Sequence, residues 1–190
     1  MGDGMTNKTQ RLFDKDSYAV TRGHDFVEIG GVKWATCNLG AENPKDPGMY
    51  FRWGDNKGVY LSEVTTNMFD TTKPVIIEPY IDAAKSLWGG KWRIPTPEDF
   101  SKLKPYFYSK IKGINGEASF FVDGTKMLLL PLSGFIERGI HYNSLVCGYY
   151  WTNYAPDIRS ATYYATGKSN YCISDVVKSY GFTIRPVLNI

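Results

Sequence analysis

The residues best suited to covalent or metal chemistry are three cysteines, Cys37, Cys147 and Cys172, and two histidines, His24 and His141. A zinc site needs cysteines or histidines at short, regular spacing, and a reactive thiol needs a base or positive charge nearby. The cysteines show no such spacing, the histidines are far apart, and HExxH, GxSxG and GxxxxGK[ST] are absent. We therefore predict no enzyme activity, no metal and no other cofactor. A single disulfide between Cys147 and Cys172 is left open.

A different chemistry, recognition through many small contacts, is indicated by the last third of the chain. Eight of the fourteen tyrosines lie between Ile140 and Tyr180, with five serines and three asparagines. Tyrosine gives a large, stiff contact, and serine and asparagine give short, adaptable hydrogen bonds, so this composition is typical of recognition loops. The candidate ligand-binding residues are polar-tipped and expected in loops or at strand ends: Tyr142, Asn143, Ser144, Asn153, Tyr154, Asp157, Arg159, Ser160, Ser169, Asn170, Tyr171 and Asp175. For any single one of these residues, a role as an ordinary solvated loop residue is as well supported as a role in binding.

Composition excludes several other classes of protein. With 190 residues, 43% hydrophobic and 22% charged, the chain is typical of a globular protein, and we expect a flexible leader at 1–17 and a single domain at 18–190. The net charge is only +3 and its lysines and arginines are scattered, which argues against nucleic acid as a partner. No stretch approaches eighteen apolar residues and the start lacks a signal peptide, so direct membrane insertion is not expected.

Two hairpins are predicted from glycine-containing pairs between strand-like segments. Residues 26–29 and 32–35 flank Gly-Gly, and residues 119–122 and 125–130 flank Asp-Gly. Both pairs suit a two-residue turn, because glycine adopts a positive φ without steric cost.

Two short helices are predicted between these hairpins. Residues 78–90 carry apolar side chains at helical spacing and reach a stop signal at Gly89. The second helix begins at Thr96, with Asp99 in position to complete an N-terminal capping box, and Pro105 ends or kinks it.

The C-terminal region is predicted to contain only strands and loops, which makes the whole layout mixed α+β. The strands are expected at 127–136, 149–154, 161–166 and 182–188. Tyr149 and Tyr150 are adjacent in a strand, as are Tyr163 and Tyr164, so one member of each pair should lie in the core and the other should be exposed.

Three tryptophans and two arginines are interpreted as structural. Trp34, Trp92 and Trp151 are expected in the core, because tryptophan is mostly buried. Arg185 directly precedes Pro186 and Arg93 stands two residues before Pro95, both in strand-like segments, and we expect the two arginines to anchor strand ends through backbone carbonyls.

Five short motifs follow one another along the chain: VKWATCNLGA at 32–41, WGGKWRIPT at 88–96, LPLSGF at 130–135, GYYWT at 148–152 and IRPV at 184–187. In that order they resemble the major-paralogous-domain (FISUMP) family of gut bacteria, over residues 28–188. This family is similar to the C-type-lectin-like fold, which also includes formylglycine-generating enzymes and the variable proteins of diversity-generating retroelements. The resemblance implies an α+β C-type-lectin-like fold, with two short helices and mostly antiparallel β-sheets, that presents a tolerant C-terminal ligand surface.

The resemblance implies a non-enzymatic ligand-binding or adhesion module, either a phage receptor-binding protein or a bacterial surface adhesin. Its expected partner is a host or bacterial surface protein or glycan, and its expected location is a virion (phage tail), the cell surface or the extracellular space. Calcium-dependent sugar binding is not implied, because Trp151-Thr152-Asn153 and Glu78-Pro79-Tyr80 depart from the lectin motifs. Two alternatives stay open: a thiol enzyme similar to formylglycine-generating enzymes, and a structural coat or surface subunit. The oligomeric state is also open.

Overall fold

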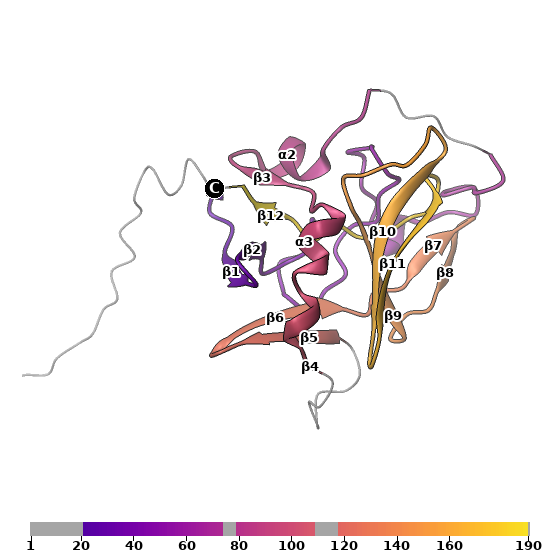
Figure 1. Cartoon of the computed structure of the whole chain (residues 1–190). Coiled ribbons are helices and arrows are strands. Elements are labelled where there is room, and N and C mark those ends of the chain that lie inside the picture. The colour runs from indigo at the N-terminus through magenta and orange to yellow at the C-terminus, as the bar shows by residue number, and fades with distance from the viewer. Residues whose placement is uncertain (1–20, 74–78, 109–117, 190) are drawn as a thin grey trace, which may run out of the picture.

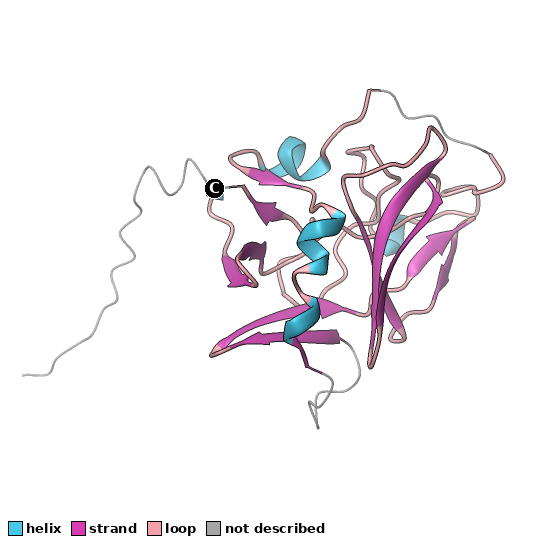
Figure 2. Cartoon of the chain, in the orientation of Figure 1, coloured by secondary structure: helices cyan, strands magenta, loops and turns pink. Residues whose placement is uncertain are grey.

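The computed structural model describes residues 21–73, 79–108 and 118–189. Over these ranges the chain is mixed α+β, with mostly antiparallel strands and a few short helices, as predicted (Figures 1 and 2). The predicted leader at 1–17 lies outside the described residues, as does Glu78, the expected start of the first helix.

The first sheet joins the beginning and the end of the described chain. It has the order β1-β2-β12-β3, in which the strands are β1 (Phe26–Ile29), β2 (Val32–Ala35), β12 (Val187–Leu188) and β3 (Trp92–Arg93). The predicted first hairpin is confirmed: Gly30 and Gly31 have φ of 61° and 73°, and all four β1 residues pair with β2.

Two short α-helices flank β3, and both are shorter than predicted. Helix α2 (Ala83–Trp88) begins after Asp82, whose side chain accepts a hydrogen bond from the Lys85 amide. Helix α3 (Pro97–Ser101) has the expected capping box between Thr96 and Asp99. Pro105 ends this helical region, as predicted, within a 3₁₀ helix, η2 (Lys104–Tyr106). Another 3₁₀ helix, η1 (Leu61–Glu63), lies earlier in the chain.

The second predicted hairpin is confirmed with a turn shifted by one residue. It belongs to a sheet of order β4-β5-β6, in which the strands are β4 (Phe107–Tyr108), β5 (Ala118–Asp123) and β6 (Lys126–Pro131). Asp123 pairs with Lys126, so the turn residues are Gly124 and Thr125 rather than Asp123 and Gly124.

The strand predicted at 127–136 is interrupted, which is a correction to the expected layout. It divides into β6 and β7 (Phe135–Glu137), and β7 pairs with β8 (Ile140–Tyr142). The break falls at Gly134, which has a φ of 66° and so closely approaches another segment that a Cβ atom would lie 2.2 Å from the Tyr142 carbonyl oxygen. Only glycine fits this crossing without displacement of the backbone.

The third sheet has the order β11-β10-β9 and carries most of the tyrosine-rich segment. Its strands are β9 (Cys147–Trp151), β10 (Ser160–Gly167) and β11 (Tyr171–Val177). Strand β11 was not predicted, because Tyr171 and Asp175 were expected in loops or at strand ends. It forms because seven consecutive residues pair with β10, and as an edge strand it tolerates polar side chains.

The C-terminal segment 181–188 passes through the middle of the molecule. Only β12 is a continuous strand there, so the strand predicted at 182–188 is largely replaced by single bridges: Gly181 to Ile136, Phe182 to Phe51, and Thr183 to Tyr150. Every residue from 181 to 188 is buried.

The core predictions are confirmed for the tryptophans and for one member of each tyrosine pair, whereas the other member is partly buried rather than exposed. Trp34, Trp92 and Trp151 are at most 1% exposed. Tyr150 and Tyr164 are buried, whereas their neighbours Tyr149 and Tyr163 are only partly buried on the opposite side of the sheet.

Candidate ligand-binding surface

The β9-β10-β11 sheet separates two aromatic environments. On one side Tyr164 stacks on Phe100 of α3, with ring centroids 4.4 Å apart, and this side is sealed in the core. On the other side Tyr149 and Tyr163 face the β7–β8 hairpin, and there the covering is incomplete. Figure 1 shows α3 and the β7–β8 hairpin at opposite sides of this sheet.

Five partly exposed rings gather on that second side, and we name them the aromatic face: Phe135, Tyr142, Tyr149, Tyr163 and Tyr180. Phe135 lies at the centre, with its ring centroid 5.3 Å from Tyr142, 5.0 Å from Tyr149 and 5.5 Å from Tyr180. Tyr163 lies 5.9 Å from Tyr149. Such spacing is favourable for aromatic pairs, so the five rings support one another as a continuous surface.

The aromatic face rests on a rigid base. Beneath it, Phe182 is 2% exposed and contacts four of the five rings directly, excluding only Tyr142. Reciprocal backbone hydrogen bonds of 2.9 Å join Ile136 to Gly181, and the Thr183 amide donates to the Tyr149 carbonyl at 3.1 Å. Four of the rings therefore project from hydrogen-bonded strands, and Tyr180 directly precedes the bridged Gly181, which lowers the entropy lost when a ligand binds.

The hydroxyl groups of Tyr149, Tyr163 and Tyr180 remain protonated at neutral pH. Burial raises the pKa of Tyr149, Tyr163 and Tyr180, so each keeps a hydrogen to donate and a lone pair to accept. Asn143 donates from Nδ2 to the Tyr149 hydroxyl at 2.9 Å. The arrangement can bind a ligand by apolar contact and by neutral hydrogen bonds together.

The predicted binding residues do not form one patch. Tyr142 belongs to the aromatic face and Asn143 lies at its edge. The loop between β9 and β10 carries Asn153, Tyr154, Asp157 and Arg159, with Ser160 opening β10; the β10–β11 turn carries Ser169 and Asn170. These last two groups lie at opposite ends of β10, which spans eight residues and hence roughly 23 Å.

Tyr171 and Asp175 are corrected from loop residues to residues of β11. The Tyr171 ring lies 5.6 Å from Phe107, on the α3 side of the sheet and away from the aromatic face. Asp175 accepts a short hydrogen bond from the Thr162 hydroxyl across the strand pair. Tyr171 therefore contributes to packing, and a substitution there would not isolate an effect on binding.

Four of the five rings of the aromatic face were missed as site residues: Phe135, Tyr149, Tyr163 and Tyr180. The adjacent tyrosine pairs gave the available signal, since strand alternation requires one ring of each pair to leave the core. Phe135 and Tyr180 gave no such signal, because only the bridge between residues 136 and 181 places them together.

The cysteines are free and lie apart in the described structure. Cys147 is opposite Gly167 in β10, and Cys172 is opposite Ala165 on the other edge of the same strand. Their strands, β9 and β11, lie two strand spacings apart, about 9.6 Å. This distance exceeds the Cα separation that a disulfide spans. The bridge left open between Cys147 and Cys172 is therefore excluded in this fold.

The histidines are held in structural contacts. His24 stacks on Trp88 with centroids 3.6 Å apart, and burial lowers its pKa. His141 Nε2 lies 2.7 Å from the Ser133 carbonyl oxygen, which also accepts from the Tyr50 hydroxyl at 2.6 Å.

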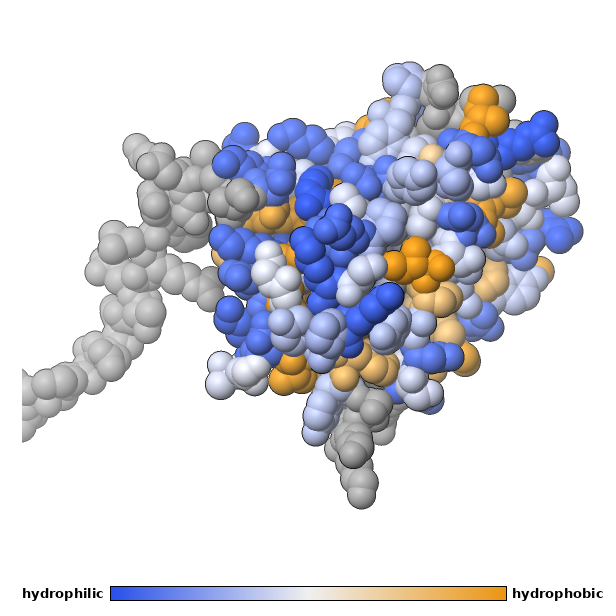
Figure 3. Space-filling model, in the orientation of Figure 1, coloured by the Kyte–Doolittle hydropathy of each residue, from blue (hydrophilic) through white to orange (hydrophobic). Residues whose placement is uncertain are grey.

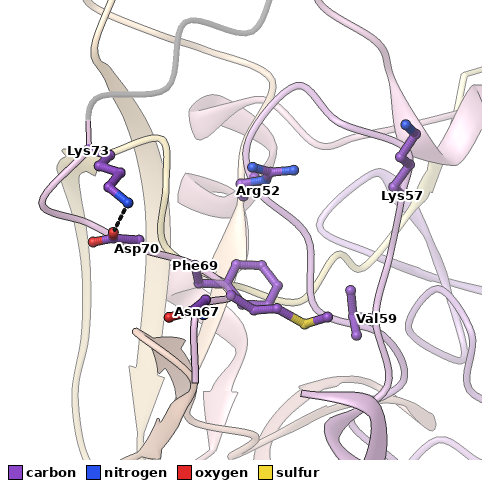
Figure 4. Close-up of a pocket in the computed structure, with 8 residues that line it drawn as sticks. Arg52, Lys57, Val59, Asn67, Phe69, Asp70 and Lys73 are labelled. Atoms are coloured by element: carbon purple, nitrogen blue, oxygen red, sulfur yellow. Dashed lines mark ion pairs between the residues drawn. The ribbon is translucent and has the colours of Figure 1, made fainter. Parts of the chain in front are cut away.

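A pocket of about 360 Å³ lies away from these residues, beside Phe69 (Figure 4). Its cations are Arg52, Lys57 and Lys73. Lys73 points toward Asp70, with 3.4 Å between Nζ and Oδ2, and Arg52 pairs with Asp55 at 3.2 Å. Two of the three positive charges are thus already compensated, which weakens this pocket as an anion site.

The visible surface in Figure 3 is largely hydrophilic, with apolar residues in separate small patches. Within residues 21–73, 79–108 and 118–189, no cluster of three His, Cys, Asp or Glu is arranged to hold a metal ion. No helix in that part is long and apolar enough to cross a membrane.

No family model, curated protein or solved structure matches this chain.

Proposed function

We propose that the chain is a non-enzymatic ligand-binding module with a C-type-lectin-like fold, and that the aromatic face is its principal contact surface. One observation carries the proposal: five partly exposed rings lie side by side, four of them on strands β7 to β10, and four of the five contact the buried Phe182. Tyrosine and other aromatic residues dominate binding hot spots, because they bury a large area and lose few rotamers.

The proposed partner is a protein or glycan on a host or bacterial surface, and the proposed setting is a phage tail or a cell surface. Strands β2, β12 and β3 belong to one sheet, and a separate sheet of order β11-β10-β9 carries most of the tyrosine-rich segment. This arrangement supports the C-type-lectin-like interpretation of the FISUMP resemblance. If the module is also a retroelement variable protein, its gene should lie beside a reverse transcriptase gene and an adenine-marked near-copy of its 3′ end.

The binding surface can be tested with labelled protein on panels of bacterial cells and immobilised glycans. The double variant Tyr142→Ser, Tyr180→Ser should reduce binding at least about tenfold, because an aromatic hot spot contributes about 2 kcal/mol. Tyr108→Ser is the matched control, since Tyr108 is 47% exposed but lies on β4, away from the aromatic face.

Melting temperatures of the three proteins must agree within a few degrees for this comparison to be read as binding. The proposal fails if the double variant binds as well as the wild type, or if Tyr108→Ser loses as much affinity as the double variant.

A further inference from the structure

A second hollow, of about 520 Å³, opens beside the loop that follows β9, and none of its lining residues belongs to the aromatic face. Its walls include Trp53, Tyr80, Asp157, Ile158 and Lys178. The hollow therefore combines two aromatic rings, an apolar side chain, a cation and a carboxylate.

Lys178 is the unusual member of this set. The residue is only 6% exposed, and its ammonium lies 4.5 Å from the centroid of the Trp53 ring. Within the described residues, no hydrogen bond or ion pair reaches this ammonium. The Asp157 carboxylate forms no ion pair with this ammonium, but its pKa is lowered by the amide hydrogen bonds from Arg159 and Ser160 and also by electrostatic attraction to Lys178. The hollow thus offers a ligand an ammonium whose hydrogen-bonding capacity is not used within the described residues.

The backbone holds this group in place. The Trp53 amide donates to the Lys178 carbonyl at 3.1 Å, and the Lys178 amide donates to the Arg159 carbonyl at 2.9 Å. On the opposite wall, the Ile81 amide donates to the Gly54 carbonyl at 3.0 Å, which sets Tyr80 with its ring centroid 4.7 Å from that of Trp53. These bonds tie three chain segments together, so the site exists before a ligand arrives.

Asp157 supplies an acceptor at the rim. Its Oδ1 accepts hydrogen bonds of 2.7 Å from the amides of Arg159 and Ser160, which fixes the carboxylate while leaving the residue exposed. A ligand that suits the whole site must therefore bring an anionic oxygen for Lys178, hydrogen-bond donors for Asp157, and a flat apolar face for Tyr80.

We propose that this hollow binds an acidic sugar, with a hexuronic acid unit placed so that its carboxylate pairs with Lys178. Its hydroxyl groups donate to Asp157, and its C–H face lies against the Tyr80 ring, which is 38% exposed. A peptide C-terminus would pair with Lys178 and donate an amide N–H to Asp157, but a hexuronic acid combines the carboxylate with adjacent hydroxyl donors and a flat C–H face for Tyr80. This inference rests on the proposed binding function and specifies one ligand class for it, a uronic-acid-containing glycan.

The test is a titration of isotope-labelled protein, followed by NMR chemical-shift changes, with three small probes. Methyl β-glucuronide should bind with millimolar affinity, methyl β-glucoside should bind at least about tenfold more weakly, and N-acetyl-leucine should not bind below roughly 10 mM. Equal affinity for glucuronide and glucoside, no binding of glucuronide, or stronger binding of N-acetyl-leucine would each overturn the proposal.

Two variants locate the site. Lys178→Met keeps the apolar stem and should abolish the preference for glucuronide, whereas Lys168→Met, at the exposed β10–β11 turn, should leave it unchanged. If Lys178→Met does not fold, Tyr80→Ala serves in its place, because Tyr80 is partly exposed; it should weaken both sugars. A Tyr80→Ala protein that binds glucuronide like the wild type would contradict the proposed pose.

The aromatic-face double variant separates this inference from the proposed function. Tyr142→Ser, Tyr180→Ser should lose cell binding but retain glucuronide binding. If glucuronide never binds while cell binding still depends on the aromatic face, only the acidic-sugar site is wrong.

Discussion

At the residue scale, Arg185 connects segment 181–188 to the first sheet through hydrogen bonds, without a carboxylate partner. It is fully buried, and it donates from Nε to the Asn38 Oδ1 at 2.8 Å and from Nη1 to the Ala35 and Thr36 carbonyls at 3.1 Å. Burial lowers its pKa to about 10, so it stays charged at neutral pH. The strand-anchoring role predicted for Arg185 is confirmed.

Arg185→Lys should lower the free energy of unfolding by about 3 kcal/mol, since one ammonium cannot replace the planar group that reaches three acceptors. Urea denaturation measures this loss. Arg159→Lys, at an exposed loop position, should change stability by less than about 0.5 kcal/mol. A similar, small effect at both positions would show that the hydrogen bonds of Arg185 contribute little.

Asp99 gives a pH-dependent contribution at the same scale. Burial opposes its ionisation, but hydrogen bonds from Arg93 and Thr96 outweigh burial and lower its pKa below 3.8. Because the folded pKa is depressed, Asp99 stabilises the fold above about pH 4, and this stabilisation is lost as the pH falls through the folded value.

Asp99→Asn should therefore cost about 2 kcal/mol at pH 7, through loss of the charged hydrogen bond from Arg93 at 2.6 Å. The difference between the two proteins should shrink as the pH falls from 5 toward 2, as followed by denaturant titration at each pH. A difference that stays constant over this range would refute the assigned ionisation.

At the element scale, turn geometry decides where the hairpins and crossings fall. Gly30 and Gly124 both have a φ of +61°, but their surroundings differ. A Cβ atom at Gly30 would lie 2.7 Å from the Lys102 carbonyl oxygen, whereas at Gly124 it would meet nothing within 4 Å. The first hairpin is thus packed against the end of α3, and the second hairpin turns in open space.

Gly124→Ala should cost about 1 kcal/mol, the strain of a left-handed alanine, while Gly30→Ala should cost at least about 2 kcal/mol because a backbone clash is added. Thermal unfolding of the two variants gives the comparison, with the shared φ as an internal control. Equal losses would mean that the contact between Gly30 and Lys102 relaxes freely.

At the scale of the whole molecule, segment 181–188 joins the first sheet, the β7–β8 hairpin and the β9-β10-β11 sheet. The order of the third sheet, β11-β10-β9, keeps two of the thiols apart, since Cys147 and Cys172 stand on strands at opposite sides of β10.

The folded protein should accordingly contain three free thiols and no internal disulfide. Alkylation in the native state should modify Cys172 first, because it is exposed, and the partly buried Cys37 and Cys147 more slowly. Mass spectrometry after timed alkylation gives the order. An oxidised protein lighter by two hydrogens, with residues 147 and 172 joined, would contradict the strand order.

By itself, the sequence determined what depends on near neighbours in the chain. The Gly-Gly turn, the Thr96–Asp99 capping box and the outward member of each tyrosine pair are local, because backbone φ, capping hydrogen bonds and strand alternation act over a few residues. These local patterns predicted the mixed α+β class and the region of the chain where a binding surface was expected.

Only the tertiary structure decided which residues share that surface. Phe135, Tyr163 and Tyr180 meet around Phe182 because single bridges bring distant segments together, and Tyr171 turns inward because β11 pairs with β10. Likewise, Lys178 reaches Trp53 only through a backbone bond between segments far apart in the chain. Such contacts depend on long-range register, which no local pattern of residues specifies.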